Sequence, residues 1–289
     1  MSFRYREIQL SDPEMAKAVL ALAGAAFGHI GGLAGLRRLI EMPEAGVAPL
    51  CLGAFFEDKL AGFLACTPHR FTYENDRLLL YQPAWAVTGE AFRGKGIFRN
   101  LIQTAEAILA PQGAGGMFAS PNPRSGPVFT GPLGFSHLGH LLIGTAWGGR
   151  GIARLGRVEE YPGHFRPVED DLLAWQHRRL GEGAISFQQD KDGNFIWAKK
   201  RSLNKMGTEV TYWLPGGINA KDPEALKSLL KAMPYPRLGL FFMTASSRYR
   251  SFFAYKKPSK SLYLVWKSYD KNLPHHPPFD AMMGLFDHF

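Results

Sequence analysis

The transition across residues 85–109 constrains the fold of this chain most, because a strand-like run passes through a short basic turn directly into an amphipathic helix. The turn places two glycines, Gly94 and Gly96, beside Arg93 and Lys95. After the turn, apolar residues recur at spacings of three and four, the pattern of a helix that packs one face on a core. They are Ile97, Leu101, Ile102, Ala105, Ile108 and Leu109. The segment therefore predicts a strand–turn–helix unit of an α/β protein.

The start of this helix has the features of an anion site. The first N–H groups of a helix have no partner within the helix and carry the positive end of its dipole. Glycines let phosphate oxygens approach those groups closely, and Arg93 and Lys95 add positive charge. The turn predicts a pyrophosphate site, although two glycines alone are also typical of a structural turn that binds nothing.

Composition excludes several classes of protein. With 46% hydrophobic and 20% charged residues the chain is not disordered, and 289 residues allow one domain or two. The net charge of +9 favours an anionic partner: nucleic acid, a phosphorylated cofactor or an acidic surface. Cys51 and Cys66 are too few for a disulfide framework or a zinc site, and their apolar surroundings predict buried, inert thiols.

The N-terminal sequence, the absence of a long apolar run and the low cysteine content together predict a cytoplasmic protein. The first residues lack the apolar region of a signal peptide. The apolar run at residues 18–36 is diluted by five glycines and interrupted by His29. We therefore expect no membrane span and a reducing compartment.

The first half of the chain predicts a mixed sheet with helices. Pro83 lies inside an expected strand, and because proline cannot donate to a ladder it implies an edge, a bulge or a splayed strand. We expect strands over residues 3–10, 50–56, 60–67, 78–88, 117–119 and 138–147, helices over 14–27, 33–41 and 94–110, and a short helix or turn over 125–130.

The second half repeats this order of elements after a glycine-rich stretch at residues 148–151, which is the expected domain boundary. We expect strands over residues 184–189, 194–199, 210–214, 238–243 and 262–266, and helices over 170–180, 223–233 and 246–254. The predicted domains are residues 1–147 and residues 152–289.

Residues 93–98 resemble the R-x-x-G-x-[GA] motif of the GNAT superfamily of N-acetyltransferases, in a form similar to one bacterial branch. Phe98 departs from the motif, which has Gly or Ala there. Residues 120–125 and the Leu-Gly-Phe at residues 133–135 resemble a later motif of the family. The resemblance covers about residues 3–147 and implies two tandem α/β domains of GNAT type with mixed sheets. The second would be a degenerate copy that lacks the glycine turn, and its role would be to shape the acceptor cleft or to stabilise the first half.

The resemblance also implies acetyl-CoA as co-substrate and assigns residues to it. The CoA pyrophosphate would be held mainly by backbone N–H groups, and the pantetheine arm would pair with the end of the splayed strand. The residues implied are Ala86, Val87, Thr88, Arg93, Gly94, Lys95, Gly96, Ile97, Phe98, Asn122 and Ser125.

The implied reaction is direct transfer of the acetyl group to the amine of a small molecule or peptide. The acceptor must first lose a proton, and the leaving thiolate is usually protonated by a Tyr. Thr130 occupies that Tyr position here, and Glu90 is the nearest carboxylate to the acyl site. Both are weak catalytic candidates, because a threonine is a poor acid and Glu90 also suits a solvated loop. The catalytic residues therefore stay unknown, and a protein that binds CoA without turnover is the alternative.

Two other patterns suggest different functions. Lysines alternate with aromatic residues over residues 252–271, which can mark single-stranded nucleic-acid binding, but a half-buried strand with a solvated face is favoured. His137 and His140 have metal-ligand spacing, yet on a strand they would point to opposite faces. No metal site is expected.

Overall fold

The structure is a computed structural model, and it forms two compact units. Unit 1 comprises Met1–Arg70, Leu78–Ser136 and Val265–His275; unit 2 comprises Phe71–Arg77, His137–Leu264 and His276–Phe289. The structure describes residues 2–28, 32–41, 45–147, 163–171, 185–205, 208–233, 238–244, 246–252 and 256–280.

Unit 1 contains a mixed sheet. Its strand order is β1 (Arg4–Glu7), β2 (Leu50–Phe56), β3 (Lys59–Tyr73), β4 (Asp76–Thr88), β5 (Gly116–Ala119) and β12 (Lys256–Ser268). The first three strands pair antiparallel, whereas β4 and β5 pair parallel. The far edge of β5 pairs antiparallel with the end of β12, where Trp266 lies opposite Phe118.

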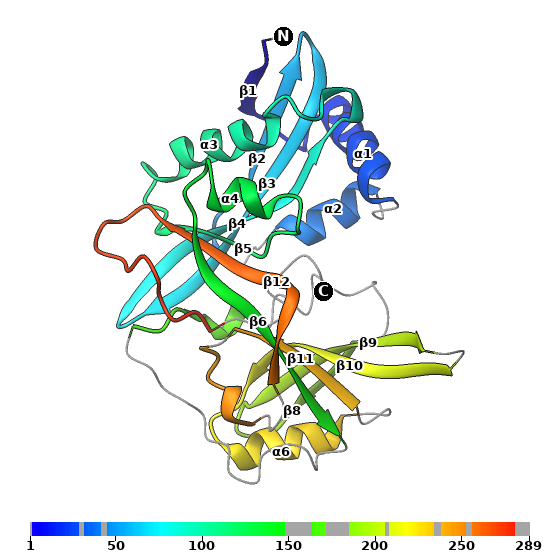
Figure 1. Ribbon diagram of the computed structural model, residues 1–289, viewed down its shortest axis with the longest axis vertical. Coiled ribbons are helices and arrows are strands. Elements are labelled where there is room, and N and C mark those ends of the chain that lie inside the picture. The colour runs from blue at the N-terminus through cyan, green and yellow to red at the C-terminus, as the bar shows by residue number, and fades with distance from the viewer. Residues whose placement is uncertain are drawn as a thin grey trace. The chain divides into compact units, whose positions relative to one another are not determined.

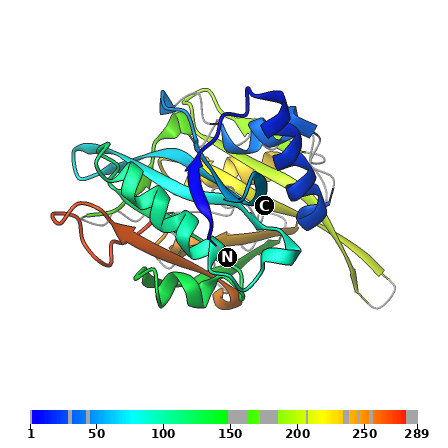
Figure 2. The same ribbon diagram turned by 90° about the horizontal axis from the view of Figure 1, so that it is seen from above.

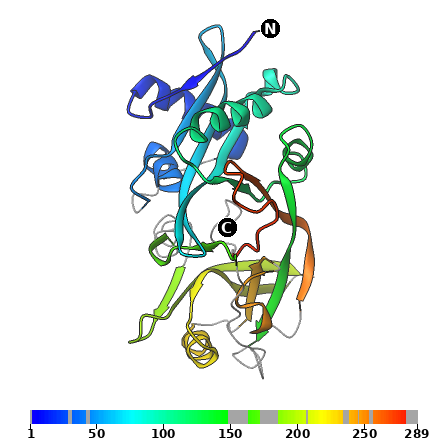
Figure 3. The same ribbon diagram turned by 90° about the vertical axis from the view of Figure 1, so that its left-hand side faces the viewer.

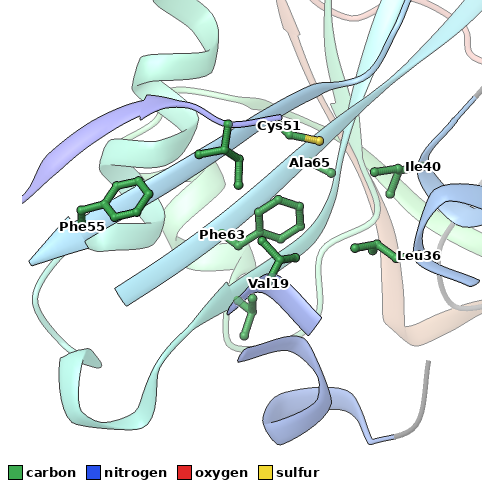
Figure 4. Packing of buried hydrophobic residues seen from close by; sticks show 9 residues of the cluster. Val19, Leu36, Ile40, Cys51, Phe55, Phe63 and Ala65 are labelled. Atoms are coloured by element: carbon green, nitrogen blue, oxygen red, sulfur yellow. The ribbon is translucent and has the colours of Figure 1, made fainter. Parts of the chain in front are cut away.

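Helices cover both faces of this sheet: α1 (Pro13–Phe27) and α2 (Gly32–Ile40) lie on one side of β2–β4, and α3 (Ile97–Leu109) lies on the other (Figures 1 and 2). Asp12 starts α1 by accepting hydrogen bonds from the N–H groups of Glu14 and Met15. Figure 4 shows the core beneath α1 and α2, formed by Val19, Leu36, Ile40, Cys51, Phe55, Phe63 and Ala65.

A glycine lets α3 approach the opposite face closely. A methyl group at Gly62 of β3 would lie 2.6 Å from the Ile97 side chain, so only glycine fits beneath the first turn of α3. The buried face of the helix consists of Ile97, Leu101, Ile102, Ala105 and Leu109, as the three- and four-residue spacing predicts.

Unit 2 contains a second mixed sheet. Its strand order is β8 (Ile185–Gln189), β9 (Phe195–Lys205), β10 (Thr208–Asn219), β11 (Leu238–Met243), β6 (Ser136–Trp147) and β12. Between the parallel strands β10 and β11 the chain forms α6 (Pro223–Ala232), which packs on this sheet (Figure 3). Their shared core contains Ile196, Ile218, Ala220, Leu226, Leu229, Met243 and Tyr249.

The expected repeat of elements is present. In unit 1 a hairpin leads to the parallel pair β4 and β5, with α3 between them, and α4 (Gly126–Thr130) follows. In unit 2 a hairpin leads to the parallel pair β10 and β11, with α6 between them, and the short helix η3 (Arg250–Phe252) follows. The final strands are exchanged: β6 pairs with β11 in unit 2, while the end of β12 pairs with β5 in unit 1.

Because of this exchange, the two units are not separated at a single point of the chain as expected. The expected boundary at residues 148–151 lies outside the described residues, and unit 1 includes residues from the last part of the sequence. The physical reason is that β5 needs a partner on its far edge, and β12 supplies it. The assignment of separate roles to residues 1–147 and 152–289 stays a prediction.

Several elements differ from their expected lengths. The hairpin of β3 and β4 is longer than expected and turns at Glu74, whose φ is +53°. The short strand β7 (Arg166–Pro167), which pairs with β3, was not expected. Residues 172–180 of an expected helix lie outside the described residues, and only η3 is helical within the described part of residues 246–254.

Among the described residues no single helix has the length and apolar character of a membrane span; α1 and α2 together pass that test, but they are bent by 78°.

Candidate functional site

The parallel strands β4 and β5 separate soon after they meet. Within the described residues their pairing is confined to Leu80 with Gly116 and Tyr81 with Met117, whereas β4 continues to Thr88. Pro83 lies just beyond the last pair, as expected for a splayed strand. The edge of β4 that faced β5 therefore has backbone groups available to a ligand.

Trp85 has a backbone conformation that bulky residues rarely adopt. Its φ is +51°, and its ring packs edge-on against Phe27 with centroids 5.1 Å apart. Such an irregularity within a strand changes the direction of the residues that follow, here Ala86, Val87 and Thr88. Strained backbone of this kind clusters at ligand sites, and in this chain it lies where β4 has left β5.

The glycine turn (residues 93–96) connects this strand end to α3. Gly94 and Gly96 have φ values of +74° and +75°, so both positions require the left-handed conformation that glycine adopts without strain. Gly96 caps α3 with no side-chain hydrogen bond, and the first helical bond runs from the Asn100 N–H to the Gly96 carbonyl. The N–H groups of the first turn of α3 thus lie beside the exposed side chains of Arg93 and Lys95.

Phe98 departs from the glycine-rich motif for a packing reason. Its ring contacts the ring of Phe129 in α4 edge-on, with centroids 5.5 Å apart, and Phe129 packs in turn on Phe135. The half-buried side chain of Phe98 therefore joins the start of α3 to α4. Only its backbone N–H is left as a candidate ligand group at the glycine turn.

Asn122 and Ser125 lie together at the start of α4. The Asn122 Oδ1 accepts hydrogen bonds from the N–H groups of Arg124 at 2.9 Å and Ser125 at 3.0 Å, and this fixes the turn that precedes the helix. Asn122 is exposed, so the turn is accessible from solvent.

The two catalytic candidates have different environments. Glu90 is exposed in the short helix η2 (Glu90–Phe92), and its carbonyl accepts a hydrogen bond from the Arg93 N–H. The hydroxyl of Thr130 donates to the carbonyl of Gly126 at 3.2 Å within α4. That bond commits the only proton that Thr130 could donate to a leaving group.

Gln82 is a further candidate site residue, which the sequence pattern did not reveal. It is the first residue of β4 beyond the paired region, it is 3% exposed, and its Oε1 has no hydrogen-bond partner among the residues that the structure describes. A buried amide oxygen without a partner is costly, which is typical of groups that bind a ligand or water. Nothing in a strand-like sequence distinguishes this glutamine from a solvated one.

Both cysteines are buried thiols, as expected. Burial, together with the negative charge of Glu41, raises the pKa of Cys51 to about 12. Burial also raises the pKa of Cys66, which has no solvent exposure. A thiol held protonated is a poor nucleophile, so neither cysteine suits covalent catalysis.

The expectation that His137 and His140 point to opposite faces is wrong. Their rings lie 5.4 Å apart, and both pack on Tyr263 at 4.9 and 5.6 Å. Gly139, with a φ of +112°, interrupts the alternation of β6 and brings the rings together. Among the described residues no group of three or more His, Cys, Asp or Glu side chains could hold a metal ion.

The lysine-rich tail supports the interpretation as a half-buried strand. Trp266 in β12 is fully buried, and its Nε1–H donates to the Pro274 carbonyl. Lys267 forms an ion pair with Glu106, while Lys257 and Lys260 are exposed. The aromatic ring of Trp266 is therefore not available for stacking on bases.

A cavity of about 330 Å³ in unit 1 lies at the other end of α3. Its lining includes Leu109 and Gln112 at the C-terminal end of that helix, together with Cys51 and Tyr81. Because α3 has 13 residues, this cavity is about 20 Å from the glycine turn along the helix.

Comparison with known proteins identifies a family resemblance over the same region. Residues 19–135 match the family model described as Acetyltransferase (GNAT) family. None of the curated proteins matches the chain.

The fold is also similar to solved structures. A GCN5-related N-acetyltransferase from Kribbella flavida is 14% identical over 93% of this chain and 72% of that chain, with a TM-score of 0.62. A GCN5-related N-acetyltransferase from Anabaena variabilis is 11% identical over 93% and 73%, with a TM-score of 0.64. Eis1 from Mycobacterium abscessus is 12% identical over 93% and 74%, with a TM-score of 0.61. At these identities the similarity is one of fold, and it extends over both units.

Proposed function

Because residues 19–135 match the family model described as Acetyltransferase (GNAT) family, we propose that this protein transfers the acetyl group of acetyl-CoA directly to the amine of a small molecule or peptide. The observation that carries the proposal is the separation of β4 from β5 immediately before a glycine turn that starts α3. The proposal places the protein in a bacterial cytoplasm, where Cys51 and Cys66 would stay reduced.

The glycine turn fits the pyrophosphate of CoA. A Cβ atom at Gly94 would meet nothing within 4 Å, so the space in front of the turn is open. The N–H groups of Ile97, Phe98 and Arg99 in the first turn of α3 would bind phosphate oxygens, with Arg93 and Lys95 beside them. Asn122 and Ser125 would contact the cofactor from the start of α4.

The open edge of β4 fits the pantetheine arm. Backbone groups of Ala86, Val87 and Thr88 would pair with its amides as a further strand would. The Gly89 N–H bonds the Ala61 carbonyl at 2.8 Å, and this fixes the end of β4. A backbone N–H of this segment would then point at the acetyl oxygen.

Acetyl-CoA supplies an acetyl group activated as a thioester. The β4 N–H would stabilise the negative charge that develops on the acetyl oxygen during attack, a contact worth about 3–4 kcal/mol in other enzymes. The attacking amine must be neutral, and Glu90 or water would accept its proton. Because the Thr130 hydroxyl donates to Gly126, we assign protonation of the leaving thiolate to water.

A second function is favoured by one observation. Thr130 lies where the family usually has a Tyr acid, so a domain that binds acetyl-CoA without turning it over would tolerate this residue. The two functions make the same prediction for binding and opposite predictions for thiol release.

A binding titration followed by a thiol assay separates them. Acetyl-CoA at about 100 times its Kd should raise the free energy of unfolding by about 2.7 kcal/mol. Release of free CoA with a panel of amines, above the rate without amine, supports acetyl transfer. Saturable binding without amine-dependent release supports the binding protein, and no stabilisation by acetyl-CoA or by CoA contradicts both.

A further inference from the structure

Unit 2 contains a cavity of about 250 Å³ that is lined by residues of that unit alone. Five separate stretches of the chain meet around it, from the turn of β3 and β4 to the last described residue. Its charged side chains are Arg77, Arg166, Glu169, Arg248 and Asp280. None of these residues belongs to the proposed acetyl-CoA site.

The backbone around the cavity is fixed by pairing between distant segments. Strand β7 pairs with β3, with Arg166 opposite Thr72, and the Thr72 hydroxyl donates to the Arg166 carbonyl at 3.4 Å. On the other side, the Asp280 N–H donates to the Phe165 carbonyl at 2.9 Å. The backbone at Arg166 and at Asp280 is therefore held in place by hydrogen bonds to distant segments of the chain.

The carboxylate of Asp280 interacts with two of the arginines that line the cavity. Its side chain is 7% exposed, and it accepts hydrogen bonds from the Ser247 side chain and the Arg248 N–H. The charges of Arg248 and Arg166 also act on this carboxylate. A buried carboxylate that attracts two arginines favours positions of their guanidinium groups close to it.

Positive charge exceeds negative charge around the cavity. Three arginines line it, together with the buried Asp280 and the exposed Glu169, so the lining residues carry three positive and two negative formal charges. Guanidinium groups bind carboxylates and phosphates through paired N–H donors, so an oxyanion is the ligand that this arrangement recognises.

The uncharged part of the lining is mixed: Thr72 and Asn219 are polar, and the remainder is largely apolar. Ile218 and Val168 contribute aliphatic surface, and Tyr249 contributes a ring, over which the Arg248 guanidinium lies at 5.7 Å. A cavity of this volume is smaller than the pockets of drug-sized ligands. We propose that the cavity binds a small organic oxyanion, with its carboxylate or phosphate on the arginines and its apolar body on Ile218, Val168 and Tyr249.

Titration of the full chain with three small probes tests this proposal. Benzoate and phenyl phosphate carry the two candidate anions on the same ring, and benzyl alcohol is the neutral match. Saturable binding of at least one anion, tighter than benzyl alcohol by about tenfold or more, is the expected result. The preferred anion identifies the headgroup. Binding of neither anion, or equal binding of all three probes, would overturn the proposal.

Two charge-removing variants test the location. Arg77→Gln removes an exposed guanidinium from the lining, and Lys191→Gln removes an exposed charge from the β8–β9 turn of the same unit. Arg77→Gln should weaken binding of the preferred probe by about tenfold, whereas Lys191→Gln should change it by less than about twofold. Equal weakening in the two variants would mean nonspecific charge attraction and would overturn the proposal.

A third variant keeps the charge and changes the geometry. Arg248→Lys retains one positive charge but loses the paired donors, so it should also weaken anion binding. Acetyl-CoA affinity should be unchanged in Arg77→Gln, which separates failure of this proposal from failure of the proposed acetyl transfer.

Discussion

The ammonium group of Lys267 lies 2.9 Å from the carboxylate of Glu106, although 161 residues separate them in the chain. The same ammonium donates to the Leu133 carbonyl at 2.8 Å and lies 5.7 Å from the centre of the Phe135 ring. One side chain of β12 thus contacts both α3 and the Leu-Gly-Phe segment of unit 1.

Lys267→Met should lower the free energy of unfolding by about 1–3 kcal/mol, because it leaves the largely buried carboxylate of Glu106 without its partner. Lys227→Met is the matched control, since Lys227 pairs with the exposed Glu224 and should cost less than about 0.5 kcal/mol. Urea unfolding measures both. Equal small losses would mean that the Lys267 pair contributes no more than a surface pair.

Gly96→Val should abolish acetyl-CoA binding while the protein stays folded. Valine at a φ of +75° is strained, by about 1–2 kcal/mol, and its side chain would stand in front of the N–H groups of α3. Gly193→Val carries the same strain at a φ of +80° in the turn between β8 and β9. Calorimetric titration should therefore find binding lost in the first variant only; equal affinities in the two would place the pyrophosphate elsewhere.

Phe98→Ala should separate folding from cofactor binding. Loss of the ring contact with Phe129 should cost about 1–3 kcal/mol of stability, because Phe98 is half-buried. Acetyl-CoA affinity should change by less than about threefold, since in the proposed site only the backbone N–H of Phe98 would face the cofactor. Intact stability with lost affinity would contradict this assignment.

Gln82→Leu should make the protein more stable and less active. Removing a buried oxygen that has no hydrogen-bond partner should raise the free energy of unfolding by about 1 kcal/mol. If that oxygen serves the ligand in the splayed region, kcat/KM for acetyl transfer should fall by about tenfold in the same variant. A stabilised variant with full activity would make Gln82 a purely structural residue.

Asp280 should make stability depend on pH. Burial raises the pKa of this carboxyl to about 6, with Arg248 and Arg166 opposing the rise. The folded state therefore holds a proton that the unfolded chain has already lost, and the contribution of Asp280 is most favourable below about pH 4 and falls as pH rises to about 6. The stability of the wild type relative to Asp280→Asn should fall over that range by an amount on the order of 3 kcal/mol. A difference that is constant with pH, or that rises, would contradict the raised pKa.

The sequence predicted local elements well, because each has a local cause. The three- and four-residue spacing of Ile97, Leu101 and Ala105 specifies the buried face of α3, and Pro83 indicates the splayed strand. The glycine turn was predicted for the same reason, since Gly94 and Gly96 are the residues that a left-handed backbone favours.

Other features depend on contacts that no local pattern contains. The contact of Phe98 with Phe129 explains a departure from the motif only when both helices are in place. The proximity of His137 and His140 depends on the backbone of Gly139, which alternation alone does not anticipate. The burial of the Gln82 side-chain oxygen and the cavity lined by Arg77 both depend on how distant segments pack together. A single sequence therefore does not reveal them.

The exchange of β6 and β12 means that β5 lacks its partner strand while the chain is being synthesised. When Ser136 has left the ribosome, the far edge of β5 has no partner, because Val265 and the residues after it do not yet exist. At about 5–20 residues per second the missing strand follows roughly 6–26 s later. Until then the nascent chain exposes a strand edge that invites pairing with other chains, so this protein should depend on protection of that edge while it is being made.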